Sequence, residues 1–121
     1  VESVIDLLDL QAYREQVVGN LSYGARKMVE VARALCTRPK LLLLDEPSSG
    51  LNPEETEDLA FWIEDINEEL GITIIMVEHD MKLVASVSDR VMAMADGQLL
   101  LIGTPQEVQE DPEVLRAYLG D

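Results

Sequence analysis

Apolar residues recur at helical spacing in the first third of the chain. The stretch 22–35 has one apolar face and one charged face, the pattern of a helix packed on a core. Its apolar face carries Met28, Val31, Ala32 and Leu35, and its charged face carries Arg26, Lys27, Glu30 and Arg33. Residues 3–10 have the same helical spacing and predict the last turns of an earlier helix. A polar connection over 11–20 joins this earlier helix to the helix 22–35. Pro39 stops the second helix.

Two short apolar runs have the pattern of buried strands. The run 41–44 is continuous, and 72–77 is rich in β-branched residues. Between them, Asn52 and Pro53 start a helix and Gly71 ends it. Its predicted inward residues are Leu59, Ile63, Ile66 and Leu70. The order strand, helix, strand predicts a right-handed parallel crossover whose sheet is covered on both faces.

The last third predicts a hairpin followed by two short helices. The runs 91–95 and 98–102 flank an Asp-Gly dipeptide at 96–97, which suits a two-residue turn. Capping signals at Thr104 and Asp111 start the helices. The second helix has an apolar stripe of Val114, Leu115, Tyr118 and Leu119. A lone helix this short is not stable in water, so we expect the tail to pack on the hairpin in the monomer, or on other subunits in an assembly.

Composition narrows the class of protein. The 121 residues fit one small domain or a piece of a larger one, and the chain opens in the middle of a helix, which suggests a fragment. A net charge of −15 disfavours nucleic acid and anionic lipid as partners. The longest apolar run is too short to span a bilayer, so any membrane role is peripheral. The single Cys36 predicts a buried, inert thiol and a reducing setting.

Polar residues that can carry chemistry follow both predicted strands. Asp45 and Glu46 come directly after the first strand, and His79 follows the second. The carboxyl ends of parallel strands share one edge, where ligands bind in α/β folds. At this edge Asp45 can hold Mg²⁺ through water and Glu46 can accept a proton. A strand end with solvated acids and an incidental histidine is the alternative.

A second candidate lies at the start of the helix 22–35. Ser22 and Gly24 offer a hydroxyl, a close-approach glycine and backbone N–H groups at the positive end of the helix dipole. This combination suits an anion. The alternative is that Ser22 is an ordinary N-cap.

These motifs resemble those of the nucleotide-binding subunits of ABC transporters, over essentially the whole chain. LSYGA at 21–25 resembles the signature motif, LLLLDEP at 41–47 the Walker B strand, SSGLN at 48–52 the D-loop and His79 the switch histidine. The ending GTPQEVQEDPEVLRAYLGD, at 103–121, resembles the ATPase of branched-chain amino acid importers.

The resemblance implies a fold class and a set of roles. The fold would be a partial P-loop NTPase (ABC ATPase) α/β fold, with covered parallel strands, a C-terminal hairpin and short helices. Glu46 would be the general base, Asp45 would lie near Mg²⁺, and His79 would contact the γ-phosphate of ATP. The residues implied for nucleotide binding are Ser22, Tyr23, Gly24, Asp45 and Asn52. Ser22 and Gly24 would serve an ATP bound mainly to a second subunit, in a head-to-tail dimer.

Three departures from the family pattern affect these roles. Tyr23 and Ala25 replace the commonest Gly and Gln of the signature, and Asn52 replaces the usual Asp of the D-loop. No G-x-x-x-x-G-K-[ST] motif occurs in the 121 residues, so we expect the phosphate loop upstream of Val1. We therefore expect the complete subunit to be an ATPase and this chain alone to be inactive.

The resemblance also implies an organisation and partners. Residues 1–20 would end the helical subdomain, 21–103 would hold the signature helix and the Walker B half of the core, and 104–121 would be a helical tail. Partners would be a second ATP-binding subunit, membrane permease subunits and, indirectly, a substrate-binding protein, at the cytoplasmic face of the membrane. Three alternatives remain. One is an importer of urea or another small amide, and one is a non-catalytic binding module. The third, an ABC-type ATPase acting on DNA or ribosomes, is disfavoured by the charge.

Overall fold

The computed structural model describes residues 1–119 and divides into two compact units, Val1–Glu78 and the residues from His79 onward. The first unit contains α1 (Glu2–Leu7), η1 (Gln11–Tyr13), η2 (Val18–Asn20), α2 (Tyr23–Leu35), β1 (Leu41–Asp45), α3 (Pro53–Leu70) and β2 (Thr73–Val77). The second contains α4 (Met81–Val87), β3 (Val91–Ala95), β4 (Gln98–Gly103), α5 (Pro105–Glu110) and α6 (Pro112–Leu119). The predicted α/β class, with parallel strands and a C-terminal hairpin, is confirmed.

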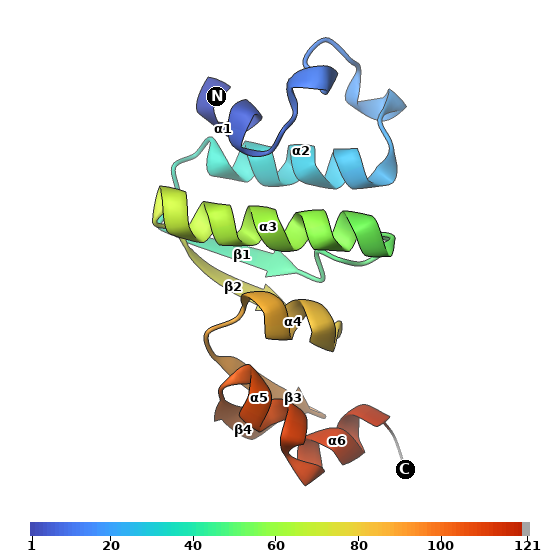
Figure 1. Ribbon diagram of the computed structural model, residues 1–121, viewed down its shortest axis with the longest axis vertical. Helices are drawn as coiled ribbons and strands as arrows, with labels where there is room; N and C mark the ends of the chain where they lie inside the picture. Colours follow the sequence, from blue (N-terminus) through green and yellow to red (C-terminus); the bar gives the residue numbers. More distant parts are fainter. Residues whose placement is uncertain (120–121) are drawn as a thin grey trace. The chain divides into compact units, whose positions relative to one another are not determined.

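The first unit is built on the parallel pair β1–β2, with α3 along one face (Figure 1). The pair aligns Leu41 with Thr73 and Asp45 with Val77. The predicted capping box starts α3, since the Asn52 side chain accepts from the Glu55 N–H at 2.8 Å and the Glu55 carboxylate accepts from the Asn52 N–H at 3.0 Å.

The inward stripe of α3 is one residue shorter than predicted. Leu59, Ile63 and Ile66 are buried, but Leu70 is 43% exposed because it lies in the last turn, just before the C-cap. That cap is Gly71, in the left-handed conformation at φ 64°, so the predicted helix end is confirmed.

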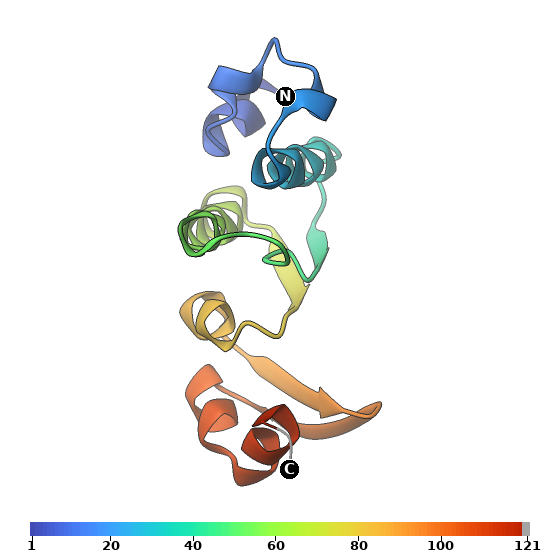
Figure 2. The ribbon, with the colours of Figure 1, turned by 90° about the vertical axis from the view of Figure 1, so that its right-hand side faces the viewer.

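The prediction that both faces of the β1–β2 pair are covered is wrong for the described residues. Leu43 is 68% exposed and its cross-strand neighbour Ile75 is 55% exposed, while Leu42 is buried. Figure 2 shows α3 on one side of the strands only. The continuous apolar runs therefore present a bare apolar face opposite α3, because helices of this unit cover only one of the two faces.

The helices at the start of the chain pack on α2. Leu8 is fully buried there, and Met28 and Leu35 of α2 are buried as predicted. The Arg14 guanidinium donates to the Glu2 carboxylate and lowers the pKa of that carboxyl, which ties α1 to the segment after η1.

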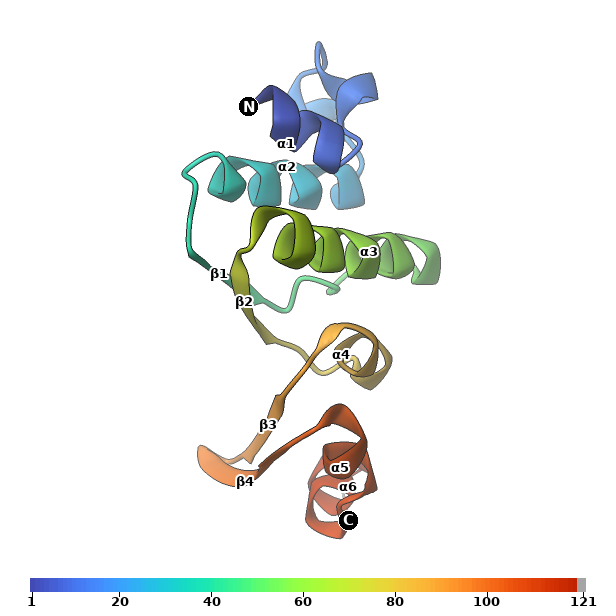
Figure 3. The same ribbon diagram turned by 60° about the vertical axis from the view of Figure 1, so that its left-hand side comes forward.

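The second unit pairs the antiparallel hairpin β3–β4 with the helices α5 and α6 (Figure 3). Both residues of the predicted turn have positive φ, Asp96 at 49° and Gly97 at 75°, as a type I′ turn requires. The prediction that the tail packs on the hairpin is confirmed, with Val108 of α5 and Val114 of α6 buried. The rest of the predicted α6 stripe, Leu115, Tyr118 and Leu119, is exposed.

Cys36 is exposed, so the predicted buried thiol is wrong. The residue is the C-cap of α2, one position past the buried Leu35, and its N–H donates to the Ala32 carbonyl. Two residues later Arg38 has a φ of 54°.

We expect Cys36 to react with a maleimide in the native protein at a rate within about tenfold of its rate in urea, since an exposed thiol needs no unfolding to be reached. Mass spectrometry of timed samples measures both rates, with Cys36→Ser as the unlabelled control. Labelling that requires unfolding would contradict the exposed position.

Candidate functional site

The two acids predicted for the site lie at the carboxyl edge of the parallel pair. β1 ends at Asp45 opposite Val77, and the Glu46 N–H continues the ladder by donating to the Val77 carbonyl at 2.8 Å. Both acidic residues are exposed. The strands thus bring the Asp45-Glu46 pair to the edge where α/β folds bind ligands.

Glu46 has an unusual backbone conformation. Its φ is 45°, in the left-handed region that residues with a Cβ rarely adopt. Such conformations persist where the surroundings enforce them, and they cluster at functional sites. Here the ladder bond to Val77 holds the N–H side, and the Ser49 N–H donates to the Glu46 carbonyl at 3.1 Å. The chain therefore turns sharply at this glutamate.

A lysine of α2 holds the loop that follows the acids. The Lys27 ammonium donates to the carbonyls of Glu46 at 3.4 Å, Pro47 at 3.1 Å and Ser49 at 2.6 Å. An ammonium has three N–H donors, so this set of acceptors matches its capacity. The same nitrogen lies 5.2 Å from the centroid of the Tyr23 ring, within the range of a cation–π contact. We call this arrangement the Lys27 clamp.

Two glycines allow the start of α2 to approach the loop and α3. A Cβ on Gly24 would lie 2.7 Å from a carboxylate oxygen of Glu55, the third helical residue of the α3 capping box. A Cβ on Gly50, which has a φ of 78°, would lie 2.6 Å from the Tyr23 ring. The predicted nucleotide-binding residues Tyr23 and Gly24 therefore pack directly against the segment 46–55.

The remaining predicted residues of this unit also have structural roles. The Ser22 hydroxyl accepts from the Ala25 N–H at 3.3 Å, so it is the N-cap that the sequence offered as the alternative. Asn52 uses its side-chain oxygen in the capping box. An N-cap role does not exclude binding of an anion by the same helix end, and the nucleotide roles of both residues remain predictions.

His79 opens the second unit. Its ring is exposed, and its carbonyl accepts a hydrogen bond from the Tyr118 hydroxyl at 2.8 Å. The prediction that His79 shares the strand edge with Glu46 stays a prediction.

Within residues 1–119, no three His, Cys, Asp or Glu side chains are grouped closely enough to form a metal site by themselves.

Sequence reasoning missed Lys27 and Glu78. It placed Lys27 on the solvated face of its helix, and it gave Glu78, whose carboxylate accepts from the Ser48 N–H at 2.8 Å, no role. Both side chains bind backbone groups of the loop after β1. Backbone partners leave no mark in the residue types, so no sequence signal identifies these contacts.

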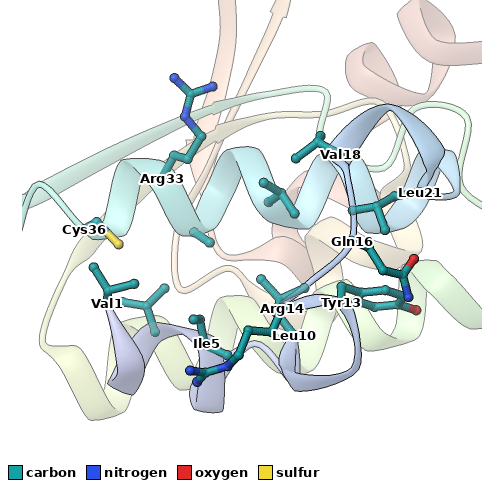
Figure 4. A pocket seen from close by; sticks show the side chains of 13 residues that line it. Val1, Ile5, Leu10, Tyr13, Arg14, Gln16, Val18, Leu21, Arg33 and Cys36 are labelled. Atoms are coloured by element: carbon teal, nitrogen blue, oxygen red, sulfur yellow. The ribbon is translucent and has the colours of Figure 1, made fainter.

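A cavity of about 250 Å³ lies apart from these residues, between the start of the chain and α2 (Figure 4). Its lining is mainly apolar, with Arg14, Gln16 and Arg33 among the lining residues. None of the residues predicted to bind nucleotide lines it.

Comparison with known proteins identifies the family. A model described as "ABC transporter" matches residues 1–49, and one described as "Branched-chain amino acid ATP-binding cassette transporter" matches residues 98–121. The chain is 41% identical to the high-affinity branched-chain amino acid transport ATP-binding protein BraF of Pseudomonas aeruginosa, over 97% of this chain and 46% of the relative. The chain belongs to the ABC transporter ATP-binding family. The resemblance inferred from the sequence is thereby confirmed.

Two other relatives also match nearly the whole chain and less than half of their own length. LivG of Escherichia coli K12, also a high-affinity branched-chain amino acid transport ATP-binding protein, is 40% identical over 97% of this chain and 46% of its own length. The methionine import ATP-binding protein MetN of Cupriavidus metallidurans is 39% identical over the whole chain and 36% of the relative. The chain thus spans about half the length, or less, of the curated relatives it matches.

Solved structures agree with this assignment. The ADP conformation of MJ1267, an ATP-binding cassette of an ABC transporter, matches with a TM-score of 0.89 at 31% identity, over 98% of this chain and 48% of that chain. The cbiO1 structure from Clostridium perfringens, part of an ABC transporter complex, matches with a TM-score of 0.85 at 34% identity, over 95% and 46% of the two chains. In residues 1–119, no helix has the length and apolar character needed to cross a membrane.

We expect Lys27→Met to lower the free energy of unfolding of the purified protein by about 1–3 kcal/mol, because three carbonyls lose a charged donor. Urea titration followed by circular dichroism measures the change. Arg26→Met is the matched control, since Arg26 is the exposed neighbour on the same helix. Equal losses for the two variants would contradict the clamp.

Proposed function

We propose that the complete subunit containing this chain binds and hydrolyses ATP and so drives import, with branched-chain amino acids as the transported class. The name of BraF supports the class, since that relative is 41% identical over nearly the whole chain. Importers of methionine and of spermidine or putrescine are almost as similar, at 39% and 38%. The choice of branched-chain amino acids therefore rests on the model that matches residues 98–121.

The residues at the strand edge fit a magnesium nucleotide. Mg²⁺ commonly uses one or two protein carboxylates, several waters and the phosphates of its nucleotide. Asp45 ends β1 and is exposed, so it can serve as the carboxylate, directly or through water. The bound ion would supply neutralisation of phosphate charge.

Glu46 is proposed as the general base, the residue that takes a proton from the attacking water. The observation that carries this assignment is its backbone, fixed at a φ of 45° immediately after a strand of the core. That turn gives adjacent residues different directions, so one acid can serve the cation and the next can serve the water. A non-glycine residue in the left-handed conformation costs free energy, and such residues cluster at active sites.

The start of α2 is proposed to bind the γ-phosphate of an ATP held mainly by a second subunit. Backbone N–H groups and the positive helix end at Ser22 and Gly24 suit an anion. The acids of the same chain would then serve the other ATP of a head-to-tail dimer. Within one chain, the Lys27 clamp joins α2 to the loop after Glu46.

The remaining assignments follow from the family. His79 is proposed to contact the γ-phosphate, Tyr23 and Asn52 to take part in nucleotide binding, and permease subunits to hold the ATPase at the cytoplasmic face of the membrane. The bare face of β1–β2 is proposed to be covered by other parts of the complete subunit. The 121-residue chain alone is proposed to be inactive, since it carries no phosphate-loop motif.

In the complete subunit, Glu46→Gln should keep ATP binding and lower kcat by about 10²–10⁴, because the amide cannot accept the proton from water. A coupled phosphate-release assay measures turnover, and equilibrium binding of a fluorescent ATP analogue measures affinity.

The matched control is Glu64→Gln, which makes the same chemical change on the exposed side of α3. It should leave both quantities unchanged. Near-normal turnover in Glu46→Gln would show that another residue is the base and would overturn the proposed mechanism.

A further inference from the structure

Two side chains of the C-terminal helices donate to backbone carbonyls around His79. The Tyr118 hydroxyl of α6 donates to the His79 carbonyl at 2.8 Å, and the Gln109 amide of α5 donates to the Met81 carbonyl at 3.2 Å. These acceptors lie on either side of Asp80, the residue that caps α4 through a bond from the Leu83 N–H. The two C-terminal helices therefore hydrogen-bond to the segment 79–81 at two points.

Helix geometry explains how the tail presents these donors. In α6, Val114 and Tyr118 are four residues apart and share a face, so the burial of Val114 also sets the position of Tyr118. The Asp111 carboxylate fixes the first turn by accepting from the N–H groups of Glu113 and Val114. In α5, Gln109 follows Val108, which is 1% exposed. Both donors thus project from anchored helices.

The His79 carbonyl lies just outside α4. Asp80 provides the first carbonyl of the helical ladder by accepting from the Val84 N–H at 3.0 Å, so His79 has no place in that ladder. Its orientation depends on contacts from elsewhere in the fold, and Tyr118 supplies one from 39 residues away. A shift of this peptide would redirect the histidine side chain.

We propose that Tyr118 is a positioning residue for His79 and that α5 and α6 form a brace for the histidine. The proposal rests on the function proposed above, in which His79 contacts the γ-phosphate. The brace lies in the region 98–121, which the model of branched-chain amino acid transporters matches. In this proposal, the segment typical of those transporters positions a residue that contacts ATP. The tail is then more than a cover for the hairpin.

The test uses the complete subunit with Tyr118→Phe, which keeps the ring and removes the hydroxyl. Losing one neutral hydrogen bond should lower kcat by about twofold to tenfold, with the KM for ATP and the melting temperature nearly unchanged. Tyr13→Phe is the matched control, a hydroxyl removed from a partly exposed tyrosine of the first unit.

Gln109→Met should have the same effect as Tyr118→Phe. Its control is Gln106→Met, which loses only a bond to Glu110 on the same helix.

A second readout isolates the brace from catalysis. Histidine NMR of the nucleotide-free subunit, with the His79 signal assigned by its loss in His79→Gln, should show this signal shifted or broadened in Tyr118→Phe and not in Tyr13→Phe. An unmoved signal overturns the brace, and so does a kcat equal to that of the control when His79→Gln itself lowers turnover. Normal turnover in His79→Gln, with the signal still moved in Tyr118→Phe, would instead remove the proposed role of His79 in hydrolysis.

Discussion

The arrangement of the first unit depends on one ammonium group. Lys27 donates to three carbonyls of the loop 46–49, and this loop follows a glutamate in the left-handed conformation. The compact charge of a lysine suits carbonyls that converge on one point, whereas the planar guanidinium of an arginine suits paired oxygens. Because Tyr23 and Gly24 pack on the same segment, the start of α2 and the acidic edge form one cluster.

LSYGA and LLLLDEP are close in sequence, and this cluster shows that the segments that carry them also pack together in the fold. In the proposed dimer each motif serves a different ATP, and within one chain Lys27, two residues after LSYGA on the same helix, donates to the Glu46 and Pro47 carbonyls. In the second unit, too, side chains donate to backbone carbonyls near a candidate site residue, since Tyr118 and Gln109 bind the backbone around His79.

The sequence predicted the features that depend on near neighbours. The capping box at Asn52, the Asp-Gly hairpin and the glycine end of α3 each involve residues within a few positions of one another, and all were found. Apolar runs predicted the strands but not the exposed outer face of β1–β2, because an apolar run does not say which other residues pack against it. The Lys27 clamp, the φ of Glu46 and the Tyr118 bond could not be predicted, because each joins a side chain or a turn to distant backbone.

The central claim is that Lys27 fixes the loop after Glu46, and amide hydrogen exchange of the complete subunit tests it most directly. In Lys27→Met, the amides of Ser48, Ser49 and Leu51 should exchange at least about tenfold faster than in the unchanged protein, because local opening of the loop becomes easier. The amides in the middle of α3 should keep their rates. Unchanged rates in the loop, or an equal rise throughout α3, would contradict the account.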